Sequence, residues 1–225
     1  MRGALVLIIA AGLAACASVL ASADTNTARA ALDRITPAEW SSNYFTLLTG
    51  VMEHTTRGEL EALAESGDAR AQNLVGEAYM VGAVGFPRDE VEGVRWLQLG
   101  AAQNFAGAQS TLGWAHETGA GDLEVDLVEA ARLYALAAEQ DEAGGLVNLG
   151  ALYLQGRGVS QDYAEARRLF LRAEPHGVAP ALGNLGVIYE RGLGVPVDRA
   201  RAADYYRRCG MEFCMVRLLG MGEAP

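Results

Sequence analysis

A repeat of 36 or 37 residues is the feature that most restricts how this chain can fold. Glycines in the middle of apolar segments recur at this spacing, and so do the glycines that end these segments and the aspartates that precede the next ones. A unit this short cannot bury its own apolar face and must stack on its neighbours, so the period predicts a solenoid. The three series are Gly76, Gly113, Gly150 and Gly186; Gly82, Gly119, Gly156 and Gly192; and Asp89, Asp126, Asp162 and Asp198.

Each unit is predicted to be a helix, a turn and a second helix, most clearly over residues 145–174. Apolar residues follow helical spacing on both sides of a turn that contains Gly156 and Gly158, and Asp162 is placed to cap the second helix. A glycine inside a helix costs about 1 kcal/mol relative to alanine, so its recurrence indicates that a neighbouring helix approaches closely. Glutamates three residues after three of the aspartates have a spacing similar to that of a capping box. They are Glu92, Glu129 and Glu165.

These landmarks carry a family resemblance. The third copy fits the pattern A-x-x-x-L-G-x-x-Y-x-x-G-x-G-V-x-x-D-Y-x-x-A-x-x-x-F, with Gly145 in place of the first alanine, and the fourth fits as closely. This pattern resembles the Sel-1-like repeat, a relative of the tetratricopeptide repeat, in four copies over residues 68–104, 105–141, 142–177 and 178–210. The resemblance implies an all-α, right-handed α-solenoid of stacked helix-turn-helix units. It also implies a role as an interaction scaffold, adaptor or regulator.

The two ends of the array are predicted to be caps. In the N-terminal cap, residues 24–67, Thr36-Pro37 resembles a helix start and Thr56-x-x-Glu59 has the capping-box pattern. The beginning of this segment, residues 24–34, is polar and rich in alanine, which indicates a tether or a frayed helix. Residues 211–225 are predicted to form a C-terminal capping helix and tail, in which Cys214 begins a fifth, truncated unit.

Residues 1–23 are predicted to be a signal peptide. Arg2 precedes an apolar run, and Ala21-Ser22-Ala23 is a cleavage site of the A-x-A type. Leu13-Ala-Ala-Cys16 also resembles a lipobox, which would make Cys16 the lipidated N-terminus, and an uncleaved anchor is a third reading. All three export the chain, so we expect it to be periplasmic or envelope-associated. Contact with the membrane would occur only through an N-terminal lipid or an uncleaved signal.

The formal net charge is −10 and the pI is about 4.8. An acidic chain repels phosphate backbones and anionic lipid, which argues against nucleic acid as a partner. We therefore expect a protein or peptide of the cell envelope, basic or of mixed charge. In related solenoids, certain first-helix positions face the concave side, and by this analogy the predicted partner-binding residues are Glu77, Met80, Trp114, Glu117, Leu154, Gln155, Glu190 and Arg191.

Trp114 stands out among these residues, because the equivalent positions hold Glu77, Ala151 and Val187. A tryptophan in a solenoid groove is a candidate binding hot spot, and the alternative is that it packs between repeats. Function is expected where copies depart from the common pattern. These places are Trp114 and His116 in the second copy, the altered turn of the first copy, and the cysteine-bearing segment after the fourth.

No catalytic, metal or cofactor motif is predicted. The turn glycines lack the spacing of a phosphate loop, His116-Glu117 has no second histidine, and no serine lies in a G-x-S-x-G elbow. His54 and His176 have no neighbours suited to metal ligation. The favoured interpretation is a non-catalytic scaffold. Two alternatives are an envelope hydrolase that acts on the cell wall or on β-lactams, as proposed for some exported cysteine-rich relatives, and a purely structural, oligomerising element.

Cys209 and Cys214 are a candidate disulfide. They join the end of one hairpin to the next helix, as in the cysteine-rich branch of the family, although the spacing there is longer. In an oxidising compartment such a pair can be bridged, and a loop this short would gain about 1–2 kcal/mol. The alternative is a pair of small buried thiols.

Overall fold

The computed structural model describes residues 25–35, 44–83 and 85–222. The predicted signal peptide with Cys16, the helix start at Thr36-Pro37 and residues 223–225 of the predicted tail lie outside these ranges. Within them the secondary structure is helical, with no strand. Four helix pairs make up the repeats: α6 (Ala69–Val81) with α7 (Glu90–Ala102), α8 (Ala106–Thr118) with α9 (Leu127–Glu139), α10 (Ala143–Gln155) with α11 (Tyr163–Ala173), and α12 (Ala179–Arg191) with α13 (Arg199–Cys209).

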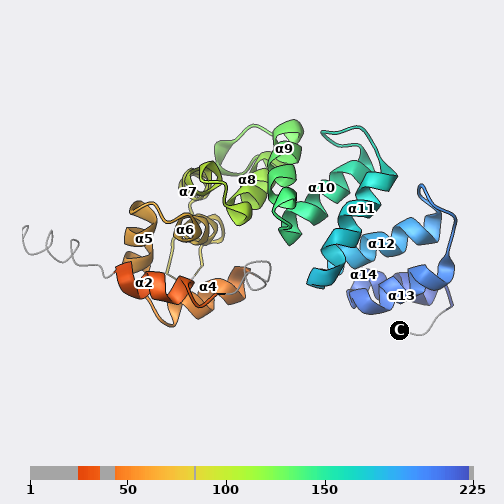
Figure 1. The fold of residues 1–225 in the computed structure, drawn as a ribbon, viewed down its shortest axis with the longest axis horizontal. Helices are drawn as coiled ribbons and strands as arrows, with labels where there is room; N and C mark the ends of the chain where they lie inside the picture. The colour runs from red at the N-terminus through yellow and green to blue at the C-terminus, as the bar shows by residue number, and fades with distance from the viewer. Residues whose placement is uncertain (1–24, 36–43, 84, 223–225) are drawn as a thin grey trace, which may run out of the picture.

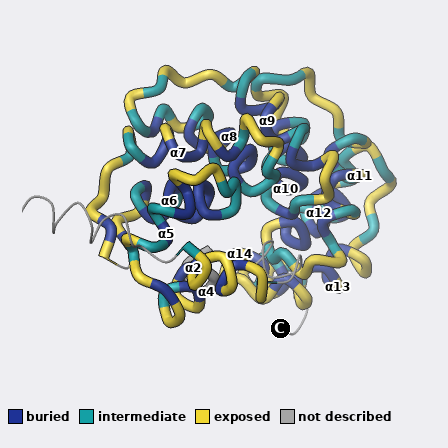
Figure 2. Tube along the Cα trace, turned by 60° about the vertical axis from the view of Figure 1, so that its left-hand side comes forward, coloured by how far each residue is buried: buried dark blue, intermediate teal, exposed yellow. Residues whose placement is uncertain are grey.

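The helix pairs stack into an arch (Figure 1). Figure 1 shows α6 and α8 on the inner side of the arch relative to α7 and α9, and Figure 2 shows α10 and α12 on the inner side relative to α11 and α13. Buried residues concentrate between these two layers, whereas the turns at the edges are mostly exposed (Figure 2). This arrangement confirms the predicted fold class, an all-α solenoid of stacked helix-turn-helix units. Flanking the repeats are α2 (Thr25–Leu32), α4 (Tyr44–Met52), α5 (Arg57–Glu65) and α14 (Glu212–Gly220).

The mid-helix glycines allow each second helix to press a large side chain against the first. A Cβ added at Gly150 would lie 2.8 Å from Cε1 of Phe170, and one added at Gly113 would lie 2.9 Å from the ring of Tyr134. The contacting side chains are fully buried, so the glycine positions set the spacing of the two layers. The pairs are Gly76 with Leu97, Gly113 with Tyr134, Gly150 with Phe170, and Gly186 with Tyr206.

Each turn is closed by the N-terminal cap of the second helix. The Asp162 side chain accepts hydrogen bonds from the backbone of Ala164 and Glu165, while its own N–H donates to the carbonyl of Tyr153 in the first helix, at 3.0 Å. Asp89, Asp126 and Asp198 repeat this N–H bond. The backbone N–H of each capping aspartate is therefore already hydrogen-bonded, so it is not available to a glutamate three residues on. The glutamates with capping-box spacing pair instead with the arginine three residues on, as in Glu165–Arg168 at 2.5 Å. The full capping box forms at Thr56 and Glu59, as predicted.

Two short 3₁₀ helices lie in the turns: η1 (Ala120–Asp122) between α8 and α9, and η2 (Glu174–His176) between α11 and α12. The second glycine of a turn, such as Gly121 or Gly158, lies against the preceding repeat. Gly121 has φ +65°, and a Cβ there would lie 2.6 Å from the Glu90 carbonyl oxygen, at the start of α7. A Cβ at Gly158 would lie even closer to the Leu127 carbonyl oxygen, at the start of α9. Glycine is therefore required twice over at these positions, by backbone conformation and by the approach of the preceding repeat.

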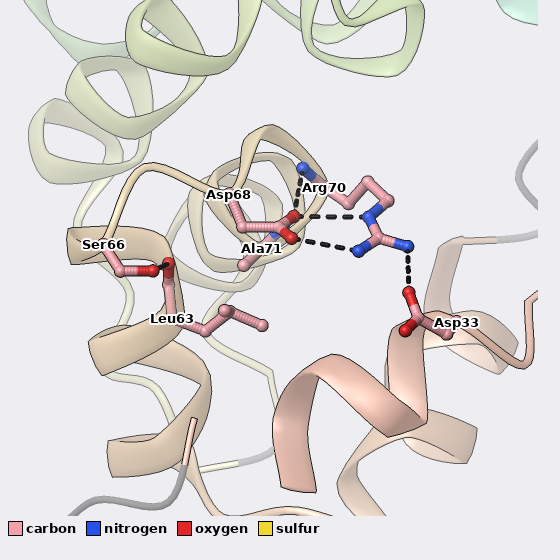
Figure 3. Close-up of polar contacts among 6 residues, drawn as sticks. All are labelled: Asp33, Leu63, Ser66, Asp68, Arg70 and Ala71. Atoms are coloured by element: carbon pink, nitrogen blue, oxygen red, sulfur yellow. Dashed lines mark hydrogen bonds and ion pairs between the residues drawn. The ribbon is translucent and has the colours of Figure 1, made fainter. Parts of the chain in front are cut away.

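The N-terminal cap is packed onto the first repeat. Ala28, Ala31 and Leu32 of α2 are buried, so this segment is an ordered helix and the expectation of a tether or frayed helix was wrong. Figure 3 shows how the cap is joined to the first repeat by Arg70, whose guanidinium donates to Asp68 at 3.0 Å and to Asp33, just after α2, at 2.9 Å.

The altered turn of the first repeat also serves the cap. Arg57 of α5 donates to the Gly85 carbonyl at 3.1 Å and to the Tyr79 hydroxyl at 2.9 Å, and it lies over the ring of Phe86. Phe86 is itself buried and meets Tyr79 edge to face. This departure from the common repeat is therefore explained by packing, although the sequence marked it as a place where function was expected.

The C-terminal end is closed by a disulfide. The Sγ atoms of Cys209 and Cys214 are bonded, and both residues are buried. The bridge lies over Gly183 of α12, where a Cβ would meet the Cys214 sulfur at 3.2 Å. It therefore holds α14 against the fourth repeat, in the place that a further first helix would occupy.

We expect Gly150→Ala to lower the free energy of unfolding by about 1–3 kcal/mol, because the added methyl group collides with the buried Phe170 ring. Gly58→Ala is the matched control. This glycine is also inside a helix but has nothing within 4 Å of an added Cβ, so the change should stabilise by about 0.5–1 kcal/mol. Urea denaturation measures both values. Equal effects at the two sites would contradict the role given to the mid-helix glycines.

Opening the disulfide should cost about 2 kcal/mol of unfolding free energy, because the reduced unfolded chain gains entropy. The measurement is urea denaturation with and without reductant, with Cys209→Ser/Cys214→Ser as a reductant-insensitive control. Complete alkylation of both cysteines without reductant would show that the bond is absent in the isolated protein.

Candidate functional site

A groove of about 420 Å³ lies between the first and second repeats, on the side of their first helices. It brings together three of the predicted binding residues, Glu77, Met80 and Trp114. The helical spacing of three and four residues aligns Glu77, Met80 and Val81 on one face of α6, and it aligns Thr111 with Trp114 on α8. The full lining is Glu77, Met80, Val81, Arg88, Glu90, Thr111 and Trp114.

The apolar part of the groove is open to solvent. Trp114 is 45% exposed and Val81 is 56% exposed, whereas Met80 is nearly buried. Met80 packs its thioether against α7, where a Cβ at Gly93 would lie 2.7 Å from its sulfur. Trp114 therefore lines the groove and is not buried between repeats, which was the alternative that the sequence left open.

Glu77 supplies a carboxyl group within the apolar lining. It accepts a hydrogen bond of 2.8 Å from the Thr111 hydroxyl. Burial raises the pKa of Glu77 to about 7, the nearby Glu142 adds to this shift, and hydrogen bonds from Thr111 and Asn73 oppose it. Among the residues that the structure describes, no cationic side chain lies within ion-pair distance of Glu77.

The charges at the rim are already paired. Arg88 donates to Glu90 at 2.5 Å, and this hydrogen bond lowers the pKa of the Glu90 carboxyl. The other Glu90 oxygen accepts from the N–H of Gly121 in the next repeat, at 3.4 Å. Arg88 and Glu90 therefore form a compact ion pair beside the groove, and Glu77 is left as its unmatched charge.

The two other acidic residues predicted on this face have partners within the chain. Glu117 accepts from Tyr134 at 3.0 Å and from Arg157 at 2.9 Å. Glu190 accepts from Tyr206 at 2.7 Å and lies 3.3 Å from Arg217. Among the acids predicted for this face, Glu117 and Glu190 are thus compensated by arginines, whereas Glu77 has no ion-pair partner among the described residues.

The remaining predicted residues lie away from the groove. Leu154 is partly buried against the core of the C-terminal repeats, while Gln155 and Arg191 are exposed. The structure therefore does not gather all eight predicted residues into one site. It brings together three of them from the first two repeats, Glu77, Met80 and Trp114.

Sequence reasoning missed Arg88, Glu90 and Thr111. Arg88 and Glu90 flank the N-cap Asp89, so their positions indicated only a helix start. Thr111 precedes the mid-helix Gly113 by two residues, a slot held by Leu74, Asn148 and Asn184 in the other copies. The hydroxyl was a usable signal, because a polar side chain on an inner helix face needs a partner from the neighbouring repeat.

Other chemistry-bearing residues do not assemble into a site. In residues 25–35, 44–83 and 85–222, no group of three or more His, Cys, Asp or Glu side chains is placed to hold a metal ion. The Nδ1 atom of His116 is buried and has no hydrogen-bond partner among the described residues. No helix of the described residues is long and apolar enough to cross a membrane.

Comparison with known protein families decides the family. The family model described as Sel1 repeat matches residues 69–105, 106–142, 143–174 and 179–208. The chain belongs to the Sel1 repeat family. Each match begins at the first residue of a first helix and ends within three residues of the end of its second helix, so this Sel1 repeat protein has four copies in the observed array. No curated protein was found to match the chain.

Solved structures include similar Sel1 repeat proteins. One from Oxalobacter formigenes is 30% identical with a TM-score of 0.61, over 81% of this chain and 67% of that one. A protective antigen of uropathogenic Escherichia coli strains that displays an SLR fold is 29% identical with a TM-score of 0.67, over 88% of this chain. The match spans 44% of that antigen, so less than half of its length is represented here.

Glu77 should make stability depend on pH. The pKa of Glu77 in the folded protein, about 7, lies above the ordinary value of 4.5. The contribution of this group to the free energy of unfolding is therefore fully present below pH 4.5 and is lost as the pH rises through 7. Glu77→Gln keeps an acceptor for Thr111 and removes the charge, and should stabilise the protein at pH 8 by up to about 3 kcal/mol.

The measurement is the difference in unfolding free energy between wild type and variant, by urea denaturation at pH 5 and pH 8. Glu139→Gln, at an exposed site on α9, removes the same charge outside the groove and should leave the difference between the two pH values unchanged. A pH-independent difference for Glu77→Gln would contradict the raised pKa.

Proposed function

We propose that the chain is a non-catalytic scaffold, adaptor or regulator that binds a protein or peptide in the bacterial cell envelope. Sel1 repeat proteins are generally protein-interaction scaffolds. In this chain the groove between the first two repeats is the proposed binding site, and the exposed Trp114 is the observation that carries the proposal.

The exposure of Trp114 supports binding because stability does not account for it. A tryptophan that is 45% exposed leaves much of its apolar surface in water, and the first helix at this slot accepts alanine or valine in the third and fourth repeats. Tryptophan is enriched among the residues that dominate interface energies, and here it has apolar neighbours and a carboxyl group within the same groove.

Location in the envelope rests on two features. Residues 1–23 have the pattern of an exported leader, and the Cys209–Cys214 disulfide is of the kind that persists in oxidising compartments. A basic or mixed-charge partner fits the groove, because Glu77 has no ion-pair partner among the described residues, whereas Arg88 and Glu90 already compensate one another.

One observation favours the oligomerising alternative. The outer side of α14 exposes Phe213, Val216 and Leu219 at helical spacing, where a further repeat would pack in a longer solenoid. The hydrolase alternative has no comparable support. The groove lining has two carboxyl groups, Glu77 and Glu90, but no serine, cysteine or histidine, and no set of metal ligands lies among the described residues.

Trp114→Ala should reduce partner capture at least about tenfold while leaving the helical circular dichroism and thermal midpoint near those of wild type, because the side chain lines the groove and is not part of the core. The measurement is affinity capture from envelope extracts of the source bacterium, quantified by mass spectrometry.

Phe213→Ala is the matched control, because Phe213 is an aromatic residue of similar exposure outside the groove. Its capture profile should equal that of wild type. If Phe213→Ala abolishes capture, or abolishes self-association in light scattering, while Trp114→Ala changes nothing, the interface lies on α14 and the proposal for the groove fails.

A further inference from the structure

The charge balance of the inner face is uneven at one place. Glu117 and Glu190 each have a tyrosine hydroxyl and an arginine from a later part of the chain. Glu77 accepts a hydrogen bond from the Thr111 hydroxyl, but no arginine of the described residues pairs with it, and it lies in the groove that also contains the exposed Trp114. Among the described residues, Glu77 is therefore the acid of this face that lacks an ion-pair partner.

The lining fits a cation carried on an aliphatic stem. Trp114, Val81 and Met80 offer apolar surface along which methylene groups can lie, and an indole face attracts a cation. The Glu77 carboxyl group then accepts charge-assisted hydrogen bonds, which are the stronger kind in a partly desolvated site. Arg88 does not compete for Glu77, because it is held by Glu90 at 2.5 Å.

We propose that the groove binds a lysine or arginine side chain of a partner peptide, with the stem against Trp114 and Val81 and the cationic group at the Glu77 carboxylate. This inference rests on the proposed function of the groove. It adds the type of partner side chain that the groove selects.

The groups around Glu77 make this recognition sensitive to pH. Thr111 donates to the carboxylate, Glu142 repels it, and the Arg88–Glu90 pair stands at the rim. Glu77 ionises near neutral pH, so a cation should bind most tightly above that range, where the carboxylate is formed without cost.

The first experiment selects binders from a phage-displayed library of random peptides on the purified protein at pH 8. Lysine or arginine next to an apolar residue should be enriched. One selected peptide is then synthesised with its basic residue and with norleucine in that position, which keeps the aliphatic stem and removes the charge. The norleucine peptide should bind at least about tenfold more weakly, by fluorescence polarisation.

The variants assign this loss to Glu77. The Glu77→Gln variant should bind the basic peptide and the norleucine peptide equally and weakly. The control variant Glu139→Gln should bind both as wild type does. The protein change at Glu77 and the peptide change to norleucine together form a double-mutant cycle. Between pH 8 and pH 6 the basic peptide should lose up to about tenfold in affinity for wild type, as follows from a carboxyl pKa near 7, and nothing for Glu77→Gln.

The outcomes separate this inference from the proposed function. Selected peptides that lack basic residues but depend on Trp114 would overturn the inference and leave the groove as the binding site. Enrichment of acidic residues would also overturn it. If no selected peptide is weakened by Trp114→Ala, the proposed function of the groove fails and the inference fails with it.

Discussion

The contact between a mid-helix glycine and a large side chain of the following helix is the constraint on which the rest of this structure depends. In each repeat, the absence of one Cβ lets Leu97, Tyr134, Phe170 or Tyr206 fill the space between the two layers of helices. The tyrosines extend through this layer to the inner face, where their hydroxyls meet Glu117 and Glu190. The same contact that spaces the helices thereby also organises the charges on the inner face.

Two of the three departures from the common repeat serve the ends of the array. The altered first turn presents Gly85 and Phe86 to Arg57 of the N-terminal cap, and the cysteines hold α14 over Gly183 at the other end. Terminal repeats of a solenoid expose apolar surface unless something covers it, so such departures have a structural cause. Trp114 covers neither end of the array, which is why we propose a binding role for it.

The groove shows where sequence reasoning about a site reached its limit. The repeat register placed Glu77, Met80 and Trp114 on one face, and the structure brings these three together. The repeat register did not show that Arg157 and Arg217 would pair with Glu117 and Glu190, because the residues of each pair are 27 or more positions apart in the sequence. The register also did not indicate that burial would move the pKa of Glu77 toward neutrality.

The sequence by itself determined the family, the helix-turn-helix repeat and the role of its glycine and aspartate landmarks, because these depend on local backbone conformation and on a period that is readable along the chain. Only the tertiary structure decided which polar groups remain unpaired and which large side chains remain exposed. Both properties are set by the stacking of one repeat on the next. For this reason the glycine-to-ring contact could be anticipated from one hairpin, whereas the groove around Glu77 and Trp114 required two neighbouring repeats in place.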